Sequence, residues 1–492
     1  MIIHRSFRLP GIAFALAVLA MAPSQARQPN IVFILADDLG WTDLACQGSK
    51  YYETPNIDRL ASQGMRMLRY YNSQNCAPTR AVLMSGQYAP RTGIYSVNTL
   101  ERGTAAERAM HVPAIQTKLA LDKYILPQAI KAAGYATGMF GKWHLGNDGP
   151  YHPGKRGFDE ALVSGGTHFD FAVNPSTEYP KGQYLADFLT DRAVDFIHRH
   201  KDHPFFLYLP HFAVHMPIQA KAEYSAEWEK KPVKGTHWNP IYAAMIQSVD
   251  DSVGRVMATL ADLKLENDTI LIFTSDNGGV GGYQRTEAPS EKKGVTDNAP
   301  LRGGKGTLYE GGIRVPFIVR WPGVVPAGAT NDTPVAHIDV YPTLVEVAGG
   351  DSKPGAVDGV SFVSILRNPH TALNREAIYW HFPGYLESYV HPKGFRTGPV
   401  GAIHAGDFKL LEFFETGKRE LYNVREDISE KNDLAASMPE KARQLQAKLA
   451  AWRVSVQAEM PRMKTPAERA ADAKNDVGKK GKKRKKAGND EN

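Results

Sequence analysis

Two pairs of adjacent polar residues in the sequence could together bind a metal ion. Asp37 and Asp38 come directly after the apolar run NIVFILA, and Asp276 and Asn277 come shortly after the apolar run TILIFT. Carboxylate and amide oxygens are hard ligands of the kind that Ca²⁺ and Mg²⁺ prefer. Either pair alone is weak evidence, because adjacent acids also occur in turns and at helix caps. Two such pairs, each after an apolar run, predict an oxygen-rich metal site.

Cys76 is a second candidate for chemistry because of the residues that follow it. It opens the segment CAPTR, which continues as AVLMSG up to Gly86. Pro78 suits the first turn of a helix, so we expect Cys76 at a helix N-terminus, where the dipole and the free N–H groups favour negative charge. Two other interpretations stay open at this point. A lone buried cysteine is more often an inert packing residue, and an exported chain could pair Cys76 with its other cysteine, Cys46.

These candidate residues need a scaffold that brings separate strand ends together. Continuous apolar runs predict strands that are buried on both faces. Such runs are Asn30–Ala36, Ala136–Phe140, Pro204–Leu209, Thr269–Thr274 and Ile313–Arg320. Pro240–Leu263 carries apolar side chains at helical spacing, and buried parallel strands with intervening helices predict an α/β fold. Open α/β sheets bind ligands beyond the carboxyl ends of their strands, which is where both polar pairs lie.

The character of the chain changes after about residue 370. Gly401–Leu411 and Glu420–Tyr422 are typical of short antiparallel strands with a polar face, and Ala435–Val454 is typical of an amphipathic helix. From Met463 onward the chain is charged and rich in Ala and Lys. We therefore predict a large domain over residues 27–370, an antiparallel-sheet plus helix subdomain over residues 371–462, and a basic disordered tail over residues 463–492.

The N-terminus has the layout of a secretory signal peptide over residues 1–26. Arg5 and Arg8 precede the apolar run Gly11–Ala22, and small residues lead to a predicted cleavage site after Ala26. A membrane anchor is the alternative, but this run is shorter than the roughly 20 residues that span a bilayer. We expect a secreted or periplasmic protein without stable membrane insertion.

The net charge of +7 comes from the C-terminal tail. Gly478–Gly488 (GKKGKKRKKAG) holds seven Lys and Arg residues and no acid, so the rest of the chain is balanced. Such a run is usually solvated, although it could also touch a polyanion or an anionic surface. We favour the solvated interpretation and expect no nucleic-acid partner.

CAPTRAVLMSG resembles the modification signature of the type I sulfatases, which belong to the alkaline phosphatase superfamily. The resemblance extends from about Asn30 to about Glu430. It implies a large mixed β-sheet sandwiched by helices, with a smaller C-terminal antiparallel-sheet subdomain, in agreement with the elements predicted above. Three further segments are similar to sulfatase motifs: Gly134–Gly146 (GYATGMFGKWHLG), Leu301–Pro316 (LRGGKGTLYEGGIRVP) and His215–Pro217 (HMP).

The resemblance implies one divalent metal ion, with Ca²⁺ as the usual ion of the family. It also implies that a formylglycine-generating enzyme oxidises Cys76 to formylglycine (3-oxoalanine), which would leave Cys46 as a small buried residue. The hydrated aldehyde would attack the sulfur of a sulfate ester with one hydroxyl and expel sulfate through the other. The implied metal ligands are Asp37, Asp38, Cys76, Asp276 and Asn277.

The same resemblance assigns catalytic roles to residues around Cys76. Arg80 and Lys142 would hold the formylglycine and its charge, and His144 would be the base for its second hydroxyl. Lys305 would bind the sulfate and stabilise developing charge, and His215 would protonate the leaving oxygen. Each of these has an ordinary alternative, because a single Lys or Arg is usually a solvated charge and a single His is usually structural.

The choice between a functional and a structural role also arises for two further histidines. We interpret His211, four residues before His215, as structural. For His381, in the segment YWHFPGY, a structural role and a position facing the substrate from the second domain are equally open.

Together these inferences predict a sulfuric ester hydrolase that removes sulfate from a sulfated poly- or oligosaccharide. The predicted export and the aromatic residues in the loops suit an extracellular carbohydrate, whose rings stack on aromatic faces. One alternative is a phosphonate or phosphodiester hydrolase of the same superfamily, and another is a general arylsulfatase. A third is an inactive relative that binds sulfated glycans, which would have lost the nucleophile or the metal ligands.

Overall fold

The computed structural model describes residues 28–283, 294–351, 357–389 and 394–487. The predicted signal peptide, residues 1–26, lies outside these ranges. None of the helices within them is long and apolar enough to span a membrane.

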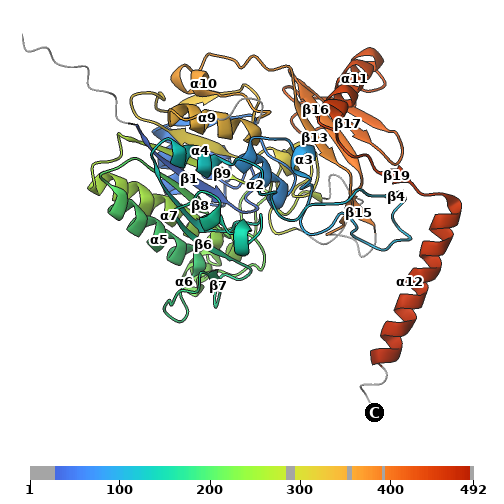
Figure 1. The fold of residues 1–492 in the computed structure, drawn as a ribbon, viewed down its shortest axis with the longest axis horizontal. Coiled ribbons are helices and arrows are strands. Elements are labelled where there is room, and N and C mark those ends of the chain that lie inside the picture. The colour runs from blue at the N-terminus through green and yellow to red at the C-terminus, as the bar shows by residue number, and fades with distance from the viewer. Residues whose placement is uncertain (1–27, 284–293, 352–356, 390–393, 488–492) are drawn as a thin grey trace, which may run out of the picture.

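A mixed sheet forms the centre of the large domain (Figure 1). It has nine strands in the order β11-β2-β10-β9-β1-β8-β5-β6-β7. The central strands β9, β1, β8 and β5 run parallel, whereas β10 and β7 pair antiparallel with their neighbours β9 and β6. The predicted α/β class is therefore confirmed. The strands are β1 (Asn30–Ala36), β2 (Met65–Met67), β5 (Ala136–Gly141), β6 (Glu160–Gly165), β7 (Ala172–Asn174), β8 (Phe205–Pro210), β9 (Thr269–Ser275), β10 (Phe317–Arg320) and β11 (Ala329–Asn331).

Strand β1 is apolar on both sides because helices cover both faces of the sheet. Its side chains alternate, so Ile31, Phe33 and Leu35 join one hydrophobic cluster and Val32 and Ile34 join the other. Because both faces of β1 are buried, its sequence is an unbroken apolar run. One face is covered by α2 (Cys76–Ser85), α4 (Leu126–Ala132), α9 (Val340–Val347) and α10 (Val363–Arg367), and the other by α1 (Pro55–Ser62), α5 (Leu185–His200), α6 (Ala222–Trp228) and α7 (Pro240–Asp262).

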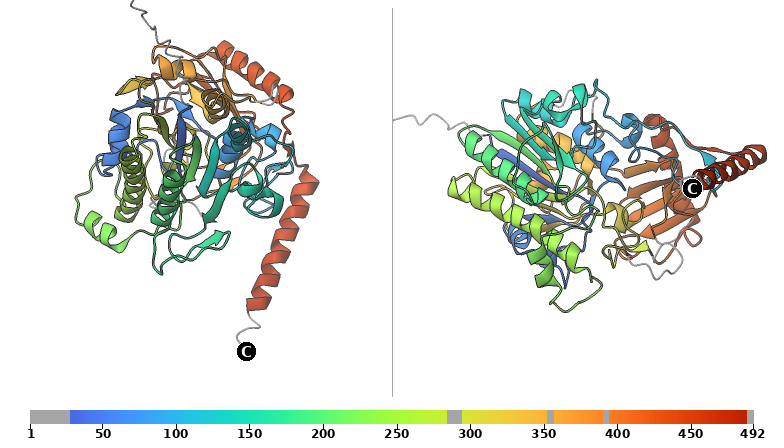
Figure 2. Two further views of the ribbon diagram at one scale, coloured as in Figure 1. Left: turned by 60° about the vertical axis from the view of Figure 1, so that its left-hand side comes forward. Right: turned by 90° about the horizontal axis from the view of Figure 1, so that it is seen from below.

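The C-terminal subdomain is an antiparallel sheet of four strands in the order β13-β16-β17-β18. Helix α11 (Pro439–Ser455) packs on this sheet through Leu445, Leu449 and Trp452. The subdomain lies against the large domain (Figure 2). A buried ion pair between Lys409 and Glu310 joins the two, with the Lys409 Nζ atom 2.9 Å from Glu310 Oε1. The strands are β13 (Ile378–Phe382), β16 (Val400–Ala405), β17 (Phe408–Phe413) and β18 (Arg419–Asn423).

Two predicted segments differ from the structure. The predicted strand Ile313–Arg320 is shorter, because β10 begins only at Phe317 and Glu310–Ile313 forms a helical turn, α8. The Glu430 carboxylate accepts the Glu310 N–H at 2.7 Å, which satisfies one of the open donors of that turn. The tail predicted to be disordered forms helix α12 (Pro466–Ala487), which projects from the body (Figure 1). Ala, Lys, Arg and Glu are strong helix formers, which accounts for this difference.

Candidate active site and metal centre

The ends of β1 and β9 bring the two predicted ligand pairs together. The strands pair in parallel with Ala36 opposite Ser275, so the chain leaves both strands at the same edge of the sheet. Asp37 and Asp276 are the next residues on each strand, and neither side chain is exposed. The backbone N–H of Asp38 donates to Asp276 Oδ1 at 3.1 Å. The sheet register therefore creates the carboxylate cluster that the sequence predicted.

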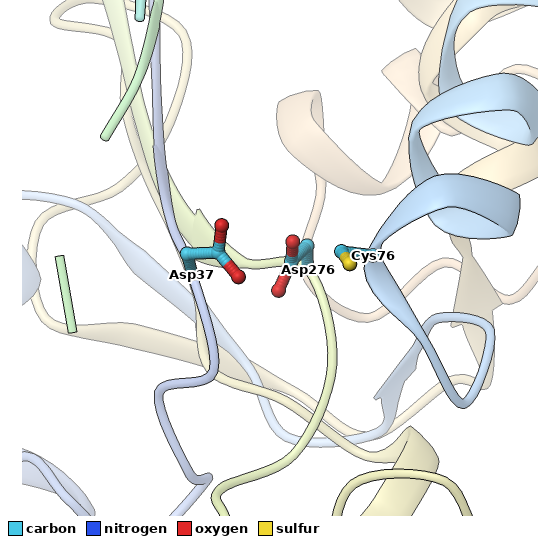
Figure 3. Close-up of side chains that lie close together, drawn as sticks. All are labelled: Asp37, Cys76 and Asp276. Carbon is cyan, nitrogen blue, oxygen red and sulfur yellow. The ribbon is translucent and has the colours of Figure 1, made fainter. Parts of the chain in front are cut away.

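Cys76 is the first residue of α2, as predicted, and it faces this cluster. Thr79 donates to the carbonyl of Asp276 at 2.7 Å, which fixes the first turn of α2 to the end of β9. One potential ligand atom from each of Asp37, Cys76 and Asp276 lies within 4.8 Å of the others (Figure 3). Burial raises the pKa of the Cys76 thiol, so the unmodified side chain is neutral. Cys46 and Cys76, both in the described part of the chain, are free thiols, so they do not form the alternative disulfide.

Two buried cationic side chains, those of Arg80 and Lys142, contact the carboxylates. Arg80 donates to Asp276 Oδ2 from Nη2 at 2.8 Å and from Nε at 3.2 Å, and its Nη2 also lies 3.3 Å from Asp37 Oδ2. The Lys142 ammonium forms a short ion pair with the same Asp37 oxygen. Burial alone would lower the pKa of Lys142, but Asp37 raises it above its ordinary value. Both cations therefore stay charged inside the protein.

Lys305 and His215 both lie close to the carboxylate of Asp38. Lys305 Nζ donates to Asp38 Oδ2 at 2.7 Å, and His215 Nε2 lies 3.6 Å from the same oxygen. Burial would raise the pKa of Asp38, but Lys305, His215 and Lys142 together lower it well below its ordinary value. Asp38 is therefore ionised.

His144 follows β5 with a left-handed backbone, φ 65°, and the residue is half-buried. Burial, followed by the nearby charges of Lys142, Arg80 and Lys305, lowers the pKa of His144 well below its ordinary value. Its Nδ1 atom is buried and has no hydrogen-bond partner among the described residues. A neutral imidazole in this position is able to accept a proton.

The oxygen atoms of the cluster fit a divalent metal ion. Asp37 Oδ1 and Asn277 Oδ1 are buried, and neither has a hydrogen-bond partner in the described part of the chain. The amide of Asn277 is held by its Nδ2 atom, which donates to Asp38 Oδ1 at 2.8 Å and to the carbonyl of Gly278 at 3.0 Å. Buried oxygens without donors are costly unless a cation satisfies them. The donor set consists of carboxylates and an amide oxygen, which matches Ca²⁺ or Mg²⁺.

A cavity of about 790 Å³ opens above this cluster, a volume typical of a small-ligand site. The five predicted residues that line it are Cys76, Lys142, His144, His215 and Lys305. The remaining predicted residues, Arg80 and the four oxygen-bearing ligands, are buried behind them.

Two histidines lie away from this cavity, within the core. His211 Nε2 lies 2.9 Å from Ser252 Oγ, and the ring is completely buried, which agrees with the structural interpretation. His381 donates from Nε2 to the carbonyl of Glu459 at 2.9 Å, and its ring packs between Tyr95 and Phe414. His381 therefore does not face the cavity, and of its two predicted roles the structural one is correct.

The sequence did not single out several residues that line the cavity. Except for Asn174, the last residue of β7, they come from loops and from a short hairpin, and no motif or periodicity marks them. They include Arg102, Asn147, Asn174, Tyr389 and Arg396.

Comparison with known proteins identifies the family. The sulfatase family model matches residues 29–350, and the model of the N-sulphoglucosamine sulphohydrolase C-terminal region matches residues 304–457. A sulfatase of Formosa agariphila is 35% identical over 509 residues, covering 87% of this chain and 89% of that protein. The human N-acetylgalactosamine-6-sulfatase is 34% identical over 374 residues, covering 70% of this chain and 67% of that protein.

A solved structure agrees with this result. The crystal structure of Ps i-CgsB in complex with k-i-k-neocarrahexaose has a TM-score of 0.72 and 30% sequence identity, and the match covers 91% of this chain and 98% of that one. The fold, the cluster at the strand ends and the family match over most of the chain lead to one conclusion. The chain belongs to the sulfatase family and is a hydrolase that acts on sulfate esters.

Proposed function

We propose that this sulfatase removes sulfate from a sulfated poly- or oligosaccharide, using a formylglycine made from Cys76 and one divalent metal ion, Ca²⁺. The observation that carries the proposal is the position of Cys76. It lies within 4.8 Å of ligand atoms of Asp37 and Asp276 and lines the same cavity as Lys305 and His215. The relatives support the carbohydrate substrate, since one acts on N-acetylgalactosamine 6-sulfate by name and one was crystallised with a neocarrahexaose.

The proposed metal ion would be held by the side chains of Asp37, Asp38, Asp276 and Asn277, together with residue 76. When bound, it supplies positive charge for the sulfate oxygens and lowers the pKa of a coordinated hydroxyl. The unpaired oxygens of Asp37 and Asn277 support these assignments. A formylglycine at position 76 would offer two hydroxyls on one carbon, which allows a sulfated adduct to be released, whereas serine would keep it.

The side chains around residue 76 are proposed to bind the sulfate ester, to position the site and to accept a proton. Lys142 and Lys305 line the cavity as ammonium groups and would bind the oxygens of the sulfate ester. Arg80 does not line the cavity, and its contacts with Asp37, Asp276 and the Lys142 carbonyl suit a positioning role. His144, held neutral by burial, would accept a proton from residue 76.

His215 is proposed to protonate the leaving alcohol, and its hydrogen bond indicates which ring nitrogen would carry the proton. Its ring nitrogen Nδ1 donates to the carbonyl of Met216 at 2.5 Å, so a neutral His215 has no proton on Nε2. Burial lowers the pKa of His215 to about 4, although Asp38 partly opposes this. His215 must therefore gain a proton when the anionic substrate enters, since a nearby negative charge favours the imidazolium form.

The chain is also proposed to be exported and matured. The signal-peptide pattern in residues 1–26 supports a secreted or periplasmic location, and modification of Cys76 requires a formylglycine-generating enzyme as a partner.

The alternatives receive less support. The names of the relatives do not favour a phosphonate or phosphodiester hydrolase. An inactive glycan-binding protein would lack the nucleophile or the ligands, whereas Cys76, Asp37, Asp38 and Asp276 are all present and close together. A general arylsulfatase stays the second candidate, because the cavity has apolar lining residues such as Val97 and Leu386.

Sulfate release from a substrate panel tests the proposed function. The panel should contain 4-nitrophenyl sulfate, bis(4-nitrophenyl) phosphate, and defined sulfated oligosaccharides of glycosaminoglycan and carrageenan type. We expect a kcat/KM for at least one oligosaccharide well above that for 4-nitrophenyl sulfate, with no comparable turnover of the phosphate diester. A preference for the aryl ester would favour the general arylsulfatase, and a preference for the diester would contradict the proposal.

A further inference from the structure

Two arginines line the active-site cavity but belong to neither the metal cluster nor the cations described above. Arg102 lies in a loop of the large domain, and Arg396 lies on β15 (Phe395–Thr397) of the C-terminal part of the chain. We call Arg102 and Arg396 the arginine pair. Both line the cavity together with Cys76 and Lys305.

The loop that carries Arg102 and the hairpin that carries Arg396 are in contact. Strand β15 pairs with β14 (Leu386–Glu387), with Glu387 opposite Phe395. The loop of Arg102 runs beside this hairpin, because the Gly103 N–H donates to Glu387 Oε1 at 3.3 Å. A Cβ atom on Gly103 would lie 2.6 Å from the ring of Phe395, so the Phe395 side chain packs directly against the backbone of Gly103. Residues 102 and 396 are each next to one of these contacting residues.

Arg396 is also fixed close to the proposed sulfate-binding lysine. Thr397 donates to the carbonyl of Gly306 at 2.6 Å. A Cβ atom on Gly306 would lie 2.4 Å from Arg396 Nε, so the guanidinium occupies the space that a side chain at 306 would fill. Lys305 precedes Gly306 in the chain. A group bound by Arg396 would therefore be a neighbour of the sulfate bound by Lys305.

The positive charges of the arginine pair have no counter-ion within the described residues. Lys142 and Lys305 pair with Asp37 and Asp38, but neither Arg102 nor Arg396 forms an ion pair in the described ranges. The Nε atom of Arg396 is buried without a hydrogen-bond partner there, and the guanidinium stacks over Tyr389 at 3.8 Å from the ring centroid. Among the described lining residues the only acid is Glu387, whose Oε1 already accepts the N–H of Gly103.

We propose that the arginine pair binds a second anionic group of the substrate, a carboxylate or a sulfate ester, while the scissile sulfate lies at Cys76. This inference rests on the proposed carbohydrate sulfatase function. Guanidinium groups present a planar fork that matches the two oxygens of such groups, and stacking on Tyr389 holds the Arg396 plane in place. A neutral sugar with a single sulfate would leave both charges unpaired. The site therefore selects saccharides that carry a second negative charge beside the sulfate to be removed.

Binding to the Ca²⁺-loaded Cys76→Ala protein tests this proposal without requiring turnover. The probes are N-acetylgalactosamine 6-sulfate, the chondroitin 6-sulfate disaccharide, which adds a carboxylate, and N-acetylgalactosamine 4,6-disulfate, which adds a sulfate. We expect at least one of the two doubly charged probes to bind about tenfold more tightly than the singly charged one. The probe that gains affinity identifies the second group as carboxylate or sulfate.

The same titrations on variants assign the effect to the arginine pair. Arg396→Gln and Arg102→Gln, each added to Cys76→Ala, should bring the affinity ratio toward one. Arg396→Lys should give a partial loss, because it keeps the charge but not the fork. Arg425→Gln, a surface arginine of the same part of the chain that is 60% exposed, should leave the ratio unchanged.

Three results would overturn the proposal. They are equal binding of all three probes by the parent protein, no binding of any probe, and a ratio that survives both glutamine variants. The wider carbohydrate-sulfatase function is judged separately, by sulfate release from the substrate panel with the unmutated enzyme. A subsite failure with intact sulfate release would leave the sulfatase function standing.

Discussion

The guanidinium of Arg80 donates two hydrogen bonds to one oxygen of Asp276, Oδ2, at 2.8 and 3.2 Å, and neither side chain is exposed. Arg80 lies on α2 four residues after Cys76, and Asp276 directly follows β9. The contact therefore ties the helix that carries Cys76 to the strand end that carries the proposed metal ligands. This buried pair helps to hold Cys76 beside the carboxylates.

Replacing Arg80 with methionine should destabilise the fold strongly. The substitution leaves Asp276 and Asp37 buried next to each other without their shared cation, and breaking a buried ion pair typically costs about 3–5 kcal/mol. Urea unfolding of the metal-free protein measures the effect. Arg425→Met, at an exposed ion pair with Asp407, is the matched control and should cost less than about 1 kcal/mol. Equal losses for the two variants would show that Arg80 does not position the cluster.

Removing one metal ligand should abolish both activity and stabilisation by the metal. Ca²⁺ raises the free energy of unfolding of a protein that binds it by about 2.7 kcal/mol when its concentration is a hundred times Kd. We expect Asp276→Ala and Asn277→Ala to lose this Ca²⁺-dependent rise in Tm together with sulfatase activity. Asp262→Ala, at an exposed residue at the end of α7, should keep both. A full Ca²⁺-dependent rise in Asn277→Ala would remove Asn277 from the proposed ligand set.

The stability that Asp276 contributes to the metal-free protein should fall as the pH rises from about 4 to about 6. Burial and then Asp37 raise the pKa of Asp276 to about 6, against the attraction of Arg80, whereas an aspartate in the unfolded chain titrates near 4. Between these values the folded state holds the proton more tightly than the unfolded state, so the stability contributed by protonated Asp276 is lost with increasing pH.

Urea unfolding of the unmutated protein and of Asp276→Asn, with a chelator present and repeated across this pH range, measures this contribution as the difference between the two proteins. The unmutated protein should lose stability relative to Asp276→Asn as the pH rises, because asparagine does not titrate. Ca²⁺ requires the ionised carboxylate, so its affinity should weaken as the pH falls below about 6. A difference between the two proteins that stays constant across this range, or that has the opposite sign, would assign the raised pKa to another group.

The loss in His215→Gln should depend on the leaving group. A sugar alcohol is a poor leaving group that needs a proton, whereas 4-nitrophenolate leaves without one. We expect kcat/KM to fall by about 10²–10⁴ for a sulfated sugar and by much less for 4-nitrophenyl sulfate. His198→Gln, at an exposed position near the end of α5, is the control. Equal losses on both substrates would mean that His215 binds sulfate without protonating the leaving oxygen.

The metal cluster could be predicted from the sequence because strand ends carry it. The apolar runs before Asp37 and Asp276 match β1 and β9, and their parallel register places both acids at one edge of the sheet. Cys76 could be predicted because Pro78 marks a first helical turn and the segment has family counterparts. These signals are local, so no knowledge of long-range contacts was needed.

The substrate side of the cavity could not be predicted in this way. Arg102 and Arg396 are far apart in the chain. They line the same cavity because Gly103 contacts Phe395 and Gly306 contacts Arg396, and no local pattern records these contacts. The role of His381 could not be decided from the sequence either, since a structural role and a position facing the substrate were equally open, and only the structure shows that the ring packs in the core. Helix α12 was missed because charge was weighted above helix propensity.

The most direct test of the whole account is sulfatase activity measured against the modification state of residue 76. Protein produced with a formylglycine-generating enzyme should contain a residue-76 peptide that has lost the elements of H₂S and gained one oxygen, as quantified by mass spectrometry. The rate of sulfate release should rise in proportion to this fraction and nearly vanish in Cys76→Ser, whose fold should survive. Full activity in protein whose residue 76 is an unmodified thiol, or in Cys76→Ser, would contradict the account.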